Sequence, residues 1–160
     1  MKIIILSVGR LKAGPERDLA QRYAERFEAS ARALGLSGPV MVEIAESQAR
    51  SAAERKTQEA QLLLAALPDD AQAIRLDERG ETLGSEVFAR NLVQWRDIGR
   101  KSLVFIIGGA DGLGEAVAER VPRCLSFGAM TMPHQLVRVL LLEQIYRAGT
   151  ILSGHPYHRI

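Results

Sequence analysis

The sequence predicts an α/β fold, a three-layer α/β/α domain with a mostly parallel sheet. Apolar, β-prone runs alternate along the chain with segments that have the periodicity of amphipathic helices. Two of these runs are continuous, which is typical of strands that are buried on both faces. With 160 residues, 47% of them hydrophobic, the chain has the size of one globular domain. Ligands of such sheets bind at the carboxyl ends of the strands.

The first two expected elements are a strand and a helix. Residues 3–8 form a continuous β-prone run that Gly9 ends. Residues from about 15 to 34 begin with a proline and are expected to form a helix, which Gly35 and Gly38 close. One side of this helix carries hydrophobic residues spaced by four, namely Leu19, Tyr23 and Phe27.

Two short strands are expected on either side of the second helix. The first covers residues 40–44, and the helix follows over about 51–67, a stretch that is rich in Ala, Glu and Gln. Residues 68–70 form a Pro-Asp-Asp turn. The next strand covers 73–76, and we expect Gly80 to break it.

The second half of the chain continues the alternation. A helix is expected over 85–97, followed by the most apolar strand at 102–107 and a short helix over 115–120. Residues 125–132 contain a final strand or an extended loop. A long helix then runs from about 134 to 152 and is apolar around most of its circumference, so it must be buried on several sides, by its own sheet and by a second copy of the chain.

The composition restricts the class of protein. A single cysteine, Cys124, cannot form an internal disulfide, and the apolar run at the start of the chain is too short for a signal sequence or a membrane span. We therefore expect a cytoplasmic protein that does not act in a membrane. The net charge of +2 argues only weakly for nucleic acid. Arginines near the C-terminus nevertheless suit phosphate recognition, namely Arg138, Arg147 and Arg159.

A glycine-rich turn directly after the strand at 102–107 predicts a binding site. Its order from Gly109 is G-x-x-G-x-G, which matches neither the dinucleotide fingerprint nor the Walker loop, so NAD and ATP are not supported. This order also disfavours a nucleotide-binding protein of the flavodoxin kind. The alternative is a plain strand-to-helix turn. A second loop with small residues, 127–132, favours a pocket in which two loops hold an adenosyl group through main-chain hydrogen bonds.

Short motifs in order along essentially the whole chain carry a family resemblance. They are Met1-Lys-Ile-Ile-Ile-Leu-Ser-Val-Gly9, Leu76-Asp77, Phe105-Ile-Ile-Gly-Gly109 with Gly112-Leu113, Leu125-Ser126 with Met130-Thr-Met-Pro-His134, Arg138-Val139, Glu143-Gln-Ile-Tyr-Arg-Ala148 and His155-Pro-Tyr-His-Arg159. Through these motifs the sequence resembles the ribosomal RNA large-subunit methyltransferase H family of the SPOUT class, which methylates N3 of a pseudouridine in 23S rRNA.

The resemblance implies a fold and partners that the sequence pattern alone does not predict. It implies one SPOUT methyltransferase domain over 1–160 with a C-terminal trefoil knot over about 72–160, although threaded connections are almost absent from proteins. It also implies a homodimer that binds S-adenosylmethionine, no metal, and 23S rRNA within the assembled ribosome as the substrate. A non-catalytic ribosome or RNA-binding module with the same fold is the alternative, and the complete polar tail argues against it.

By similarity, the cofactor pocket is formed by the strand end, the glycine turn and the second loop. The expected cofactor-binding residues are Leu76, Gly108, Phe127, Gly128, Ala129, Met130, Thr131 and Met132. Gly109 is added because it lies beside Gly108.

The expected catalytic residues are mostly in the tail. N3 of a pseudouridine is protonated at neutral pH, so some group must accept the proton, and a histidine or a water held by one is the simplest candidate. The candidates are His155, Tyr157, His158, Arg159 and Arg138. The tail of one protomer is expected to complete the site of the other.

Other roles for some of these residues stay open. Arg138 is equally consistent with a structural role, and His134 is expected to make a structural hydrogen bond at the start of the last helix. Zinc bound by His134, His155 and His158 is a weak alternative because the usual cysteines and carboxylate spacing are missing.

Overall fold

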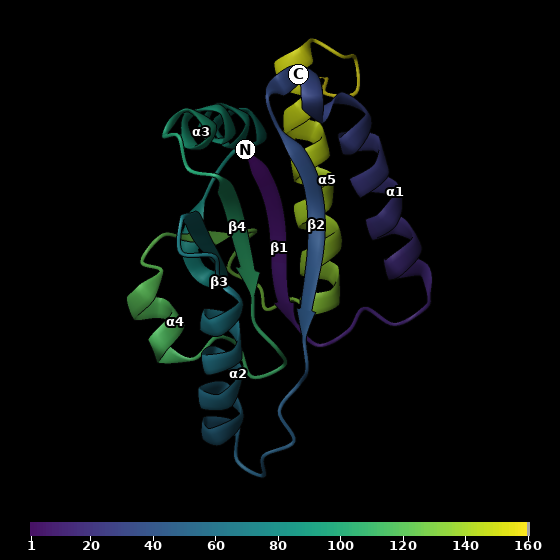
Figure 1. Ribbon diagram of the computed structural model, residues 1–160. Coiled ribbons are helices and arrows are strands. Elements are labelled where there is room, and N and C mark those ends of the chain that lie inside the picture. Colours follow the sequence, from purple (N-terminus) through teal and green to yellow (C-terminus); the bar gives the residue numbers. More distant parts are fainter. Residues whose placement is uncertain (160) are drawn as a thin grey trace.

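The computed structural model of the protein describes residues 1–159, and in that range it contains one five-stranded sheet with helices on both faces (Figure 1). The elements in chain order are β1 (Lys2–Val8), α1 (Pro15–Ala31), a 3-10 turn η1 (Arg32–Leu34), β2 (Ser37–Ile44), α2 (Ala52–Ala66), β3 (Ala71–Thr82), α3 (Ser85–Asp97), β4 (Ser102–Ile107), α4 (Glu115–Arg120), β5 (Cys124–Ser126) and α5 (His134–Ser153). None of the helices among the described residues is long and apolar enough to cross a membrane.

The sheet has the order β2-β1-β4-β3-β5, and every neighbouring pair is parallel. The predicted α/β fold with a parallel sheet is therefore confirmed. Because all strands point the same way, their carboxyl ends meet at one edge, where the arrowheads lie in Figure 1. α5 begins beside this edge and ends at the opposite end of the molecule, close to the C-terminus. The trefoil knot does not follow from strand order and stays a prediction.

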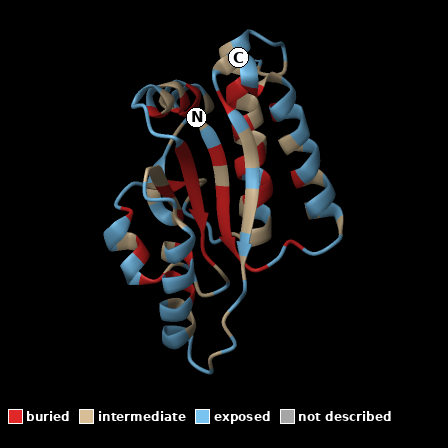
Figure 2. Ribbon diagram, viewed as in Figure 1, coloured by how far each residue is buried: buried red, intermediate tan, exposed pale blue. Residues whose placement is uncertain are grey.

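Alternating side chains of β1 build the cores on the two faces of the sheet. Ile3 and Ile5 pack with residues of α1, α3 and α5, whereas Leu6 and Val8 pack with residues of α2 and α4. β4 is buried along its whole length, as Figure 2 shows. The central strands thus read as continuous apolar runs because both of their faces are covered.

Two sequence predictions about glycines are wrong. β3 does not end at Gly80 but continues to Thr82, with a register shift against β5 between Leu76 and Glu81. A Cβ on Gly80 would lie 2.5 Å from the carbonyl carbon of Leu125, so this glycine allows the close approach of β5. Gly38 does not close α1 but lies within β2. The segment predicted at 125–132 is a three-residue strand, β5, followed by a loop.

The contact between α1 and α5 generates a stability prediction. Phe27 of α1 is fully buried, and a Cβ on Gly149 of α5 would lie 3.1 Å from its ring. Replacement of Phe27 by Ala should lower the free energy of unfolding by about 3–5 kcal/mol, measured by urea denaturation, because it leaves a cavity between the two helices. The neighbouring exposed Glu28→Ala is the control and should change it by less than about 0.5 kcal/mol. A loss below about 1 kcal/mol in Phe27→Ala would contradict this packing.

Candidate active site

A cavity of about 310 Å³ lies at the carboxyl ends of β3, β4 and β5. Its walls come from the strand ends, the glycine turn after β4, the loop after β5 and the first turn of α5. Lys56 of α2 closes one side. The volume is within the usual range for small-molecule sites, and the position is where ligands of parallel sheets bind.

The glycine turn folds back on itself to form one wall. Gly109 and Gly112 pair as a β-bridge, and the N–H of Gly112 donates to the carbonyl of Gly109 at 3.0 Å. A Cβ on Gly108 would lie 2.7 Å from the carbonyl carbon of Gly112, so only glycine fits this bend. The turn therefore presents main chain to the cavity.

An ion pair holds the glycine turn against α2. Arg55 donates from Nε to Oδ2 of Asp111 at 2.7 Å and from Nη2 to Oδ1 at 3.1 Å. Its guanidinium also bonds the carbonyls of Ala49 and Arg50. The hydrogen bond from Arg55 holds the pKa of Asp111 below its usual range, so the pair stays charged at neutral pH. Sequence reasoning missed this pair because 56 residues separate its members.

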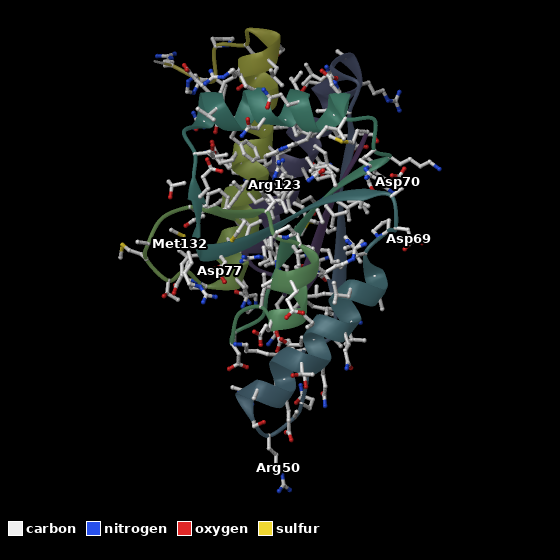
Figure 3. All side chains as sticks on the ribbon, turned by 90° about the vertical axis from the view of Figure 1, so that its left-hand side faces the viewer. Arg50, Asp69, Asp70, Asp77, Arg123 and Met132 are labelled. Atoms are coloured by element: carbon white, nitrogen blue, oxygen red, sulfur yellow. The ribbon has the colours of Figure 1, made fainter. Side chains whose placement is uncertain are left out.

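The loop after β5 is tied to the end of β3. The N–H of Gly128 donates to Oγ of the buried Ser126 at 3.0 Å, and that hydroxyl donates to the carbonyl of Glu78 at 3.2 Å. Thr131 donates from Oγ1 to Oε2 of Glu78 at 2.7 Å. Asp77 and Met132 both line the cavity and lie at the same side of the molecule in Figure 3. These bonds fix the second main-chain wall.

The structure brings nearly all of the predicted cofactor residues together. The cavity is lined by Leu76, Gly108, Gly109, Phe127, Gly128, Met130, Thr131 and Met132. Ala129 is exposed and does not line it. The lining residues that were not among the predicted ones include Lys56, Asp77, His134 and Val137. Asp77 had a signal in the sequence, since it directly follows Leu76 in the strand that ends at this edge.

Asp77 gives the cavity a fixed negative charge. Its side chain is 12% exposed, and Nε of Arg79 donates to its Oδ1 at 2.9 Å. That hydrogen bond holds the pKa of Asp77 below its usual range, against the opposing effect of burial. The carboxylate can therefore accept hydrogen bonds from hydroxyl or amino groups of a ligand.

The tail is anchored on the second half of α5. The hydroxyl of Tyr157 donates to Oε1 of Glu143 at 3.1 Å, and its ring packs against Tyr146 and below the guanidinium of Arg147. Arg147 in turn pairs with Glu143 at 2.5 Å. Burial, together with hydrogen bonds to Tyr23 and Glu143, raises the pKa of Tyr157, so it stays a neutral phenol.

The remaining tail residues are held less tightly. Nδ1 of His155 accepts the N–H of Tyr157 at 3.2 Å, and Nδ1 of His158 lies 3.5 Å from Nη1 of Arg147. Nε2 of His158 lies 3.9 Å from Oε1 of Glu86 on α3. His155 and Arg159 are exposed.

Within one chain, the tail and the cavity are far apart. The tail contacts α5 at Glu143 and Arg147, and the cavity is lined by His134 at the start of that helix. Nine to thirteen residues of helix correspond to about 14–20 Å along the axis. For the same reason His134 and His155, at opposite ends of α5, do not come together as zinc ligands.

Arg138 is buried away from the cavity and has structural partners. Its side chain is fully buried, Nη2 donates to the carbonyls of Val8 and Gly9, and Nη1 donates to Oε1 of Glu43 at 3.0 Å. The N–H of Leu11 donates to the same Glu43 oxygen. These contacts fix the loop after β1 to α5. They favour the structural alternative for Arg138 over contact with a substrate.

The fold agrees with comparisons to known proteins. The family described as predicted SPOUT methyltransferase matches residues 1–158. The chain belongs to the SPOUT methyltransferases. Within this class its relatives are ribosomal RNA large subunit methyltransferases H, as the motifs predicted. One from Rhodopseudomonas palustris strain BisB18 is 54% identical over 159 residues, and the match covers 99% of this chain and 99% of that protein. One from Methylorubrum populi is 55% identical over 160 residues, and the match covers 99% of this chain and 97% of that protein.

A solved structure supports the fold alone. A probable methylase family protein from Haemophilus influenzae superposes with a TM-score of 0.51 over 99% of this chain and 70% of its own, at 10% sequence identity.

The contacts of Arg138 generate a prediction. Replacement by Met should lower the free energy of unfolding by about 3 kcal/mol in urea denaturation, because it leaves the carbonyls of Val8 and Gly9 buried without donors. Arg90→Met is the matched control, since Arg90 forms an exposed pair with Glu86 at 4.0 Å, and should cost less than about 0.5 kcal/mol. Equal stability of Arg138→Met and the wild type would show that these bonds do not hold the loop.

Proposed function

We propose that the protein transfers a methyl group from S-adenosylmethionine to N3 of a pseudouridine in 23S rRNA of the assembled ribosome. The observation that carries this proposal is a cavity between two main-chain loops in a chain that is 54% identical, over nearly its whole length, to a ribosomal RNA large subunit methyltransferase H. Action on the ribosome implies a cytoplasmic protein. We extend the proposal to the trefoil knot over about 72–160 within a single domain.

The residues of the cavity fit this donor. Gly112 and Gly128, one from each loop, have φ angles of 84° and 140°, and a Cβ on either would meet no atom within 4 Å, so bare main chain faces open space. Leu76, Met132 and Val137 provide apolar walls for an adenine ring. Asp77 provides an acceptor for hydroxyl or amino groups. When bound, the donor supplies an electrophilic methyl group on a sulfonium.

Positioning accounts for most of the expected rate enhancement. Methyl transfer is an in-line displacement, in which the enzyme needs to align the base with the methyl group and exclude other geometries. The tail supplies groups suited to hold the RNA base and its phosphates, namely His155, Tyr157, His158 and Arg159. The bonds from Tyr157 to Glu143 and α5 pre-arrange this segment before the substrate arrives.

The distance between cavity and tail supports a homodimer as the active unit. The start and the end of α5 carry the two halves of the site, so an antiparallel pairing with a second α5 brings one chain's tail beside the other chain's cavity. Apolar side chains near the start of α5 are exposed enough to form such a contact. They are Met130 at 80%, Leu136 at 45% and Leu140 at 38%.

The activity is testable with labelled S-adenosylmethionine and ribosomes. We expect label on one pseudouridine of 70S particles, located by mapping the modified base, with less on 50S subunits and naked rRNA. Gly108→Ala should weaken donor binding by about 100-fold in calorimetry, because its Cβ would collide with the main chain of Gly112. Gly84→Ala, where a Cβ meets nothing within 4 Å, should bind normally. Donor binding without transfer to any RNA would instead favour a non-catalytic module.

Completion of the site across the dimer is testable by mixing two inactive variants. Gly108→Ala lacks a working cavity, and His158→Ala lacks a working tail while it should fold and bind the donor normally. After co-refolding of equal amounts, about one site in four should combine an intact cavity with an intact tail, so transfer should recover to about a quarter of the wild-type rate. Recovery of no activity, or a fully active monomer at high dilution, would contradict the shared site.

A further inference from the structure

The ring of one histidine at the cavity makes no polar contact within residues 1–159. His134 is the first residue of α5, lines the cavity and is only partly exposed. Its ring forms no hydrogen bond or ion pair with any other residue in the described range, so the structural hydrogen bond predicted from the sequence is wrong. Neither ring nitrogen is fully buried without a partner. The imidazole is therefore free to bond a ligand in the cavity.

The surroundings of His134 favour the neutral imidazole. Burial lowers its pKa from the ordinary value of 6.5, and the guanidinium of Arg138, one helical turn further along α5, lowers it further. Glu46, after β2, and Glu59, on α2, act in the opposite direction, but the pKa of His134 remains below its ordinary value. The other charged side chains around the cavity are Lys56, Asp77, Glu78, Arg79 and Asp111.

Other groups near the cavity are poorer proton acceptors. Arg79 and Arg55 hold the pKa values of Asp77 and Asp111 low, which makes both carboxylates weak bases. In the tail, Nδ1 of His155 already accepts a main-chain hydrogen bond, and His158 lies between Arg147 and Glu86. Neutral His134 has both the free nitrogen and the protonation state that the reaction requires.

We infer that His134 of the chain that holds the donor is the proton acceptor of the methyl transfer, and this inference rests on the proposed function. The imidazole takes the N3 proton of the pseudouridine, directly or through one water, and the electron pair left on N3 forms the new bond to the methyl carbon. The carbon–sulfur bond breaks, and its electron pair stays on sulfur, which becomes a neutral thioether. The imidazolium then returns the proton to solvent.

This assignment divides the work between the two chains of the dimer. The chain that binds the donor removes the proton, and the tail of its partner positions the base. Arg138 acts as a positioning residue, because its carbonyl contacts fix the first turn of α5, and its charge adds to the effect of burial in lowering the pKa of His134.

The test compares His134→Gln with the wild type in single-turnover methyl transfer to 70S particles between pH 5.5 and 9. Glutamine keeps a polar side chain but cannot accept the proton, so the rate at pH 7 should fall about 100-fold, as is typical for loss of a general base. The wild-type rate should decline only below pH 6.5. The variant's rate should rise about tenfold per pH unit, because N3 of the pseudouridine must then lose its proton to solvent without help from the protein. Donor affinity should stay unchanged. Gln135→Ala, at the next position on α5, is the control.

Two further readouts separate proton transfer from folding and donor binding. NMR titration of the His134 ring in the protein without donor should give a pKa below 6.5. Added imidazole should restore part of the rate of His134→Ala. It should not change the rate of Gln135→Ala, which we expect to equal that of the wild type.

Each failure has a distinct meaning. A His134→Gln variant with the wild-type rate and pH profile would overturn the inference and leave the proposed function intact. A variant that loses donor affinity would also overturn the inference, because it would assign His134 to cofactor binding, and it too would leave the proposed function intact. Wild-type protein that binds the donor but labels no RNA would overturn the proposed function and this inference with it.

Discussion

The length and anchoring of α5 are the constraint on which the rest of the molecule depends. Its first turn lines the cavity, its second turn places Arg138 against the carbonyls after β1, and Glu143 and Arg147, further along, hold the tail. A straight helix cannot bring its two ends together, so the cavity and the tail of one chain lie apart. The exposed leucines near the start of the same helix offer a second copy the surface that would join them.

The cavity is built from main chain more than from side chains. The bend at Gly108 requires a residue without a Cβ, and main-chain atoms form the bridge between Gly109 and Gly112. The main chain at Gly128 is held by the hydroxyl of Ser126. The ion pair between Arg55 and Asp111 holds the glycine turn against α2. Walls of this kind need little rearrangement to grip a ligand, which suits a reaction that depends on alignment.

The sequence predicted the elements well because their signals are local. α3, β4 and α4 have the predicted bounds, since their caps and apolar runs lie within a few residues of each other. The cavity-forming loops were also predicted, partly from glycine positions and partly from resemblance. Features that depend on distant residues were not predicted. They are the close approach of β5 at Gly80, the contacts of Arg138 with the carbonyls after β1, and the lack of a hydrogen-bond partner for the His134 ring among residues 1–159. The separation of the tail from the cavity agrees with the predicted helix over about 134–152, because a helix of that length keeps its two ends apart.

A crystal structure of the protein with S-adenosylmethionine tests the central claim most directly. We expect the donor between the glycine turn and residues 127–132, in a twofold dimer where the partner's tail lies against the methyl group and His134 faces the same space. A donor bound elsewhere, or copies arranged so that every tail stays remote from every cavity, would contradict it.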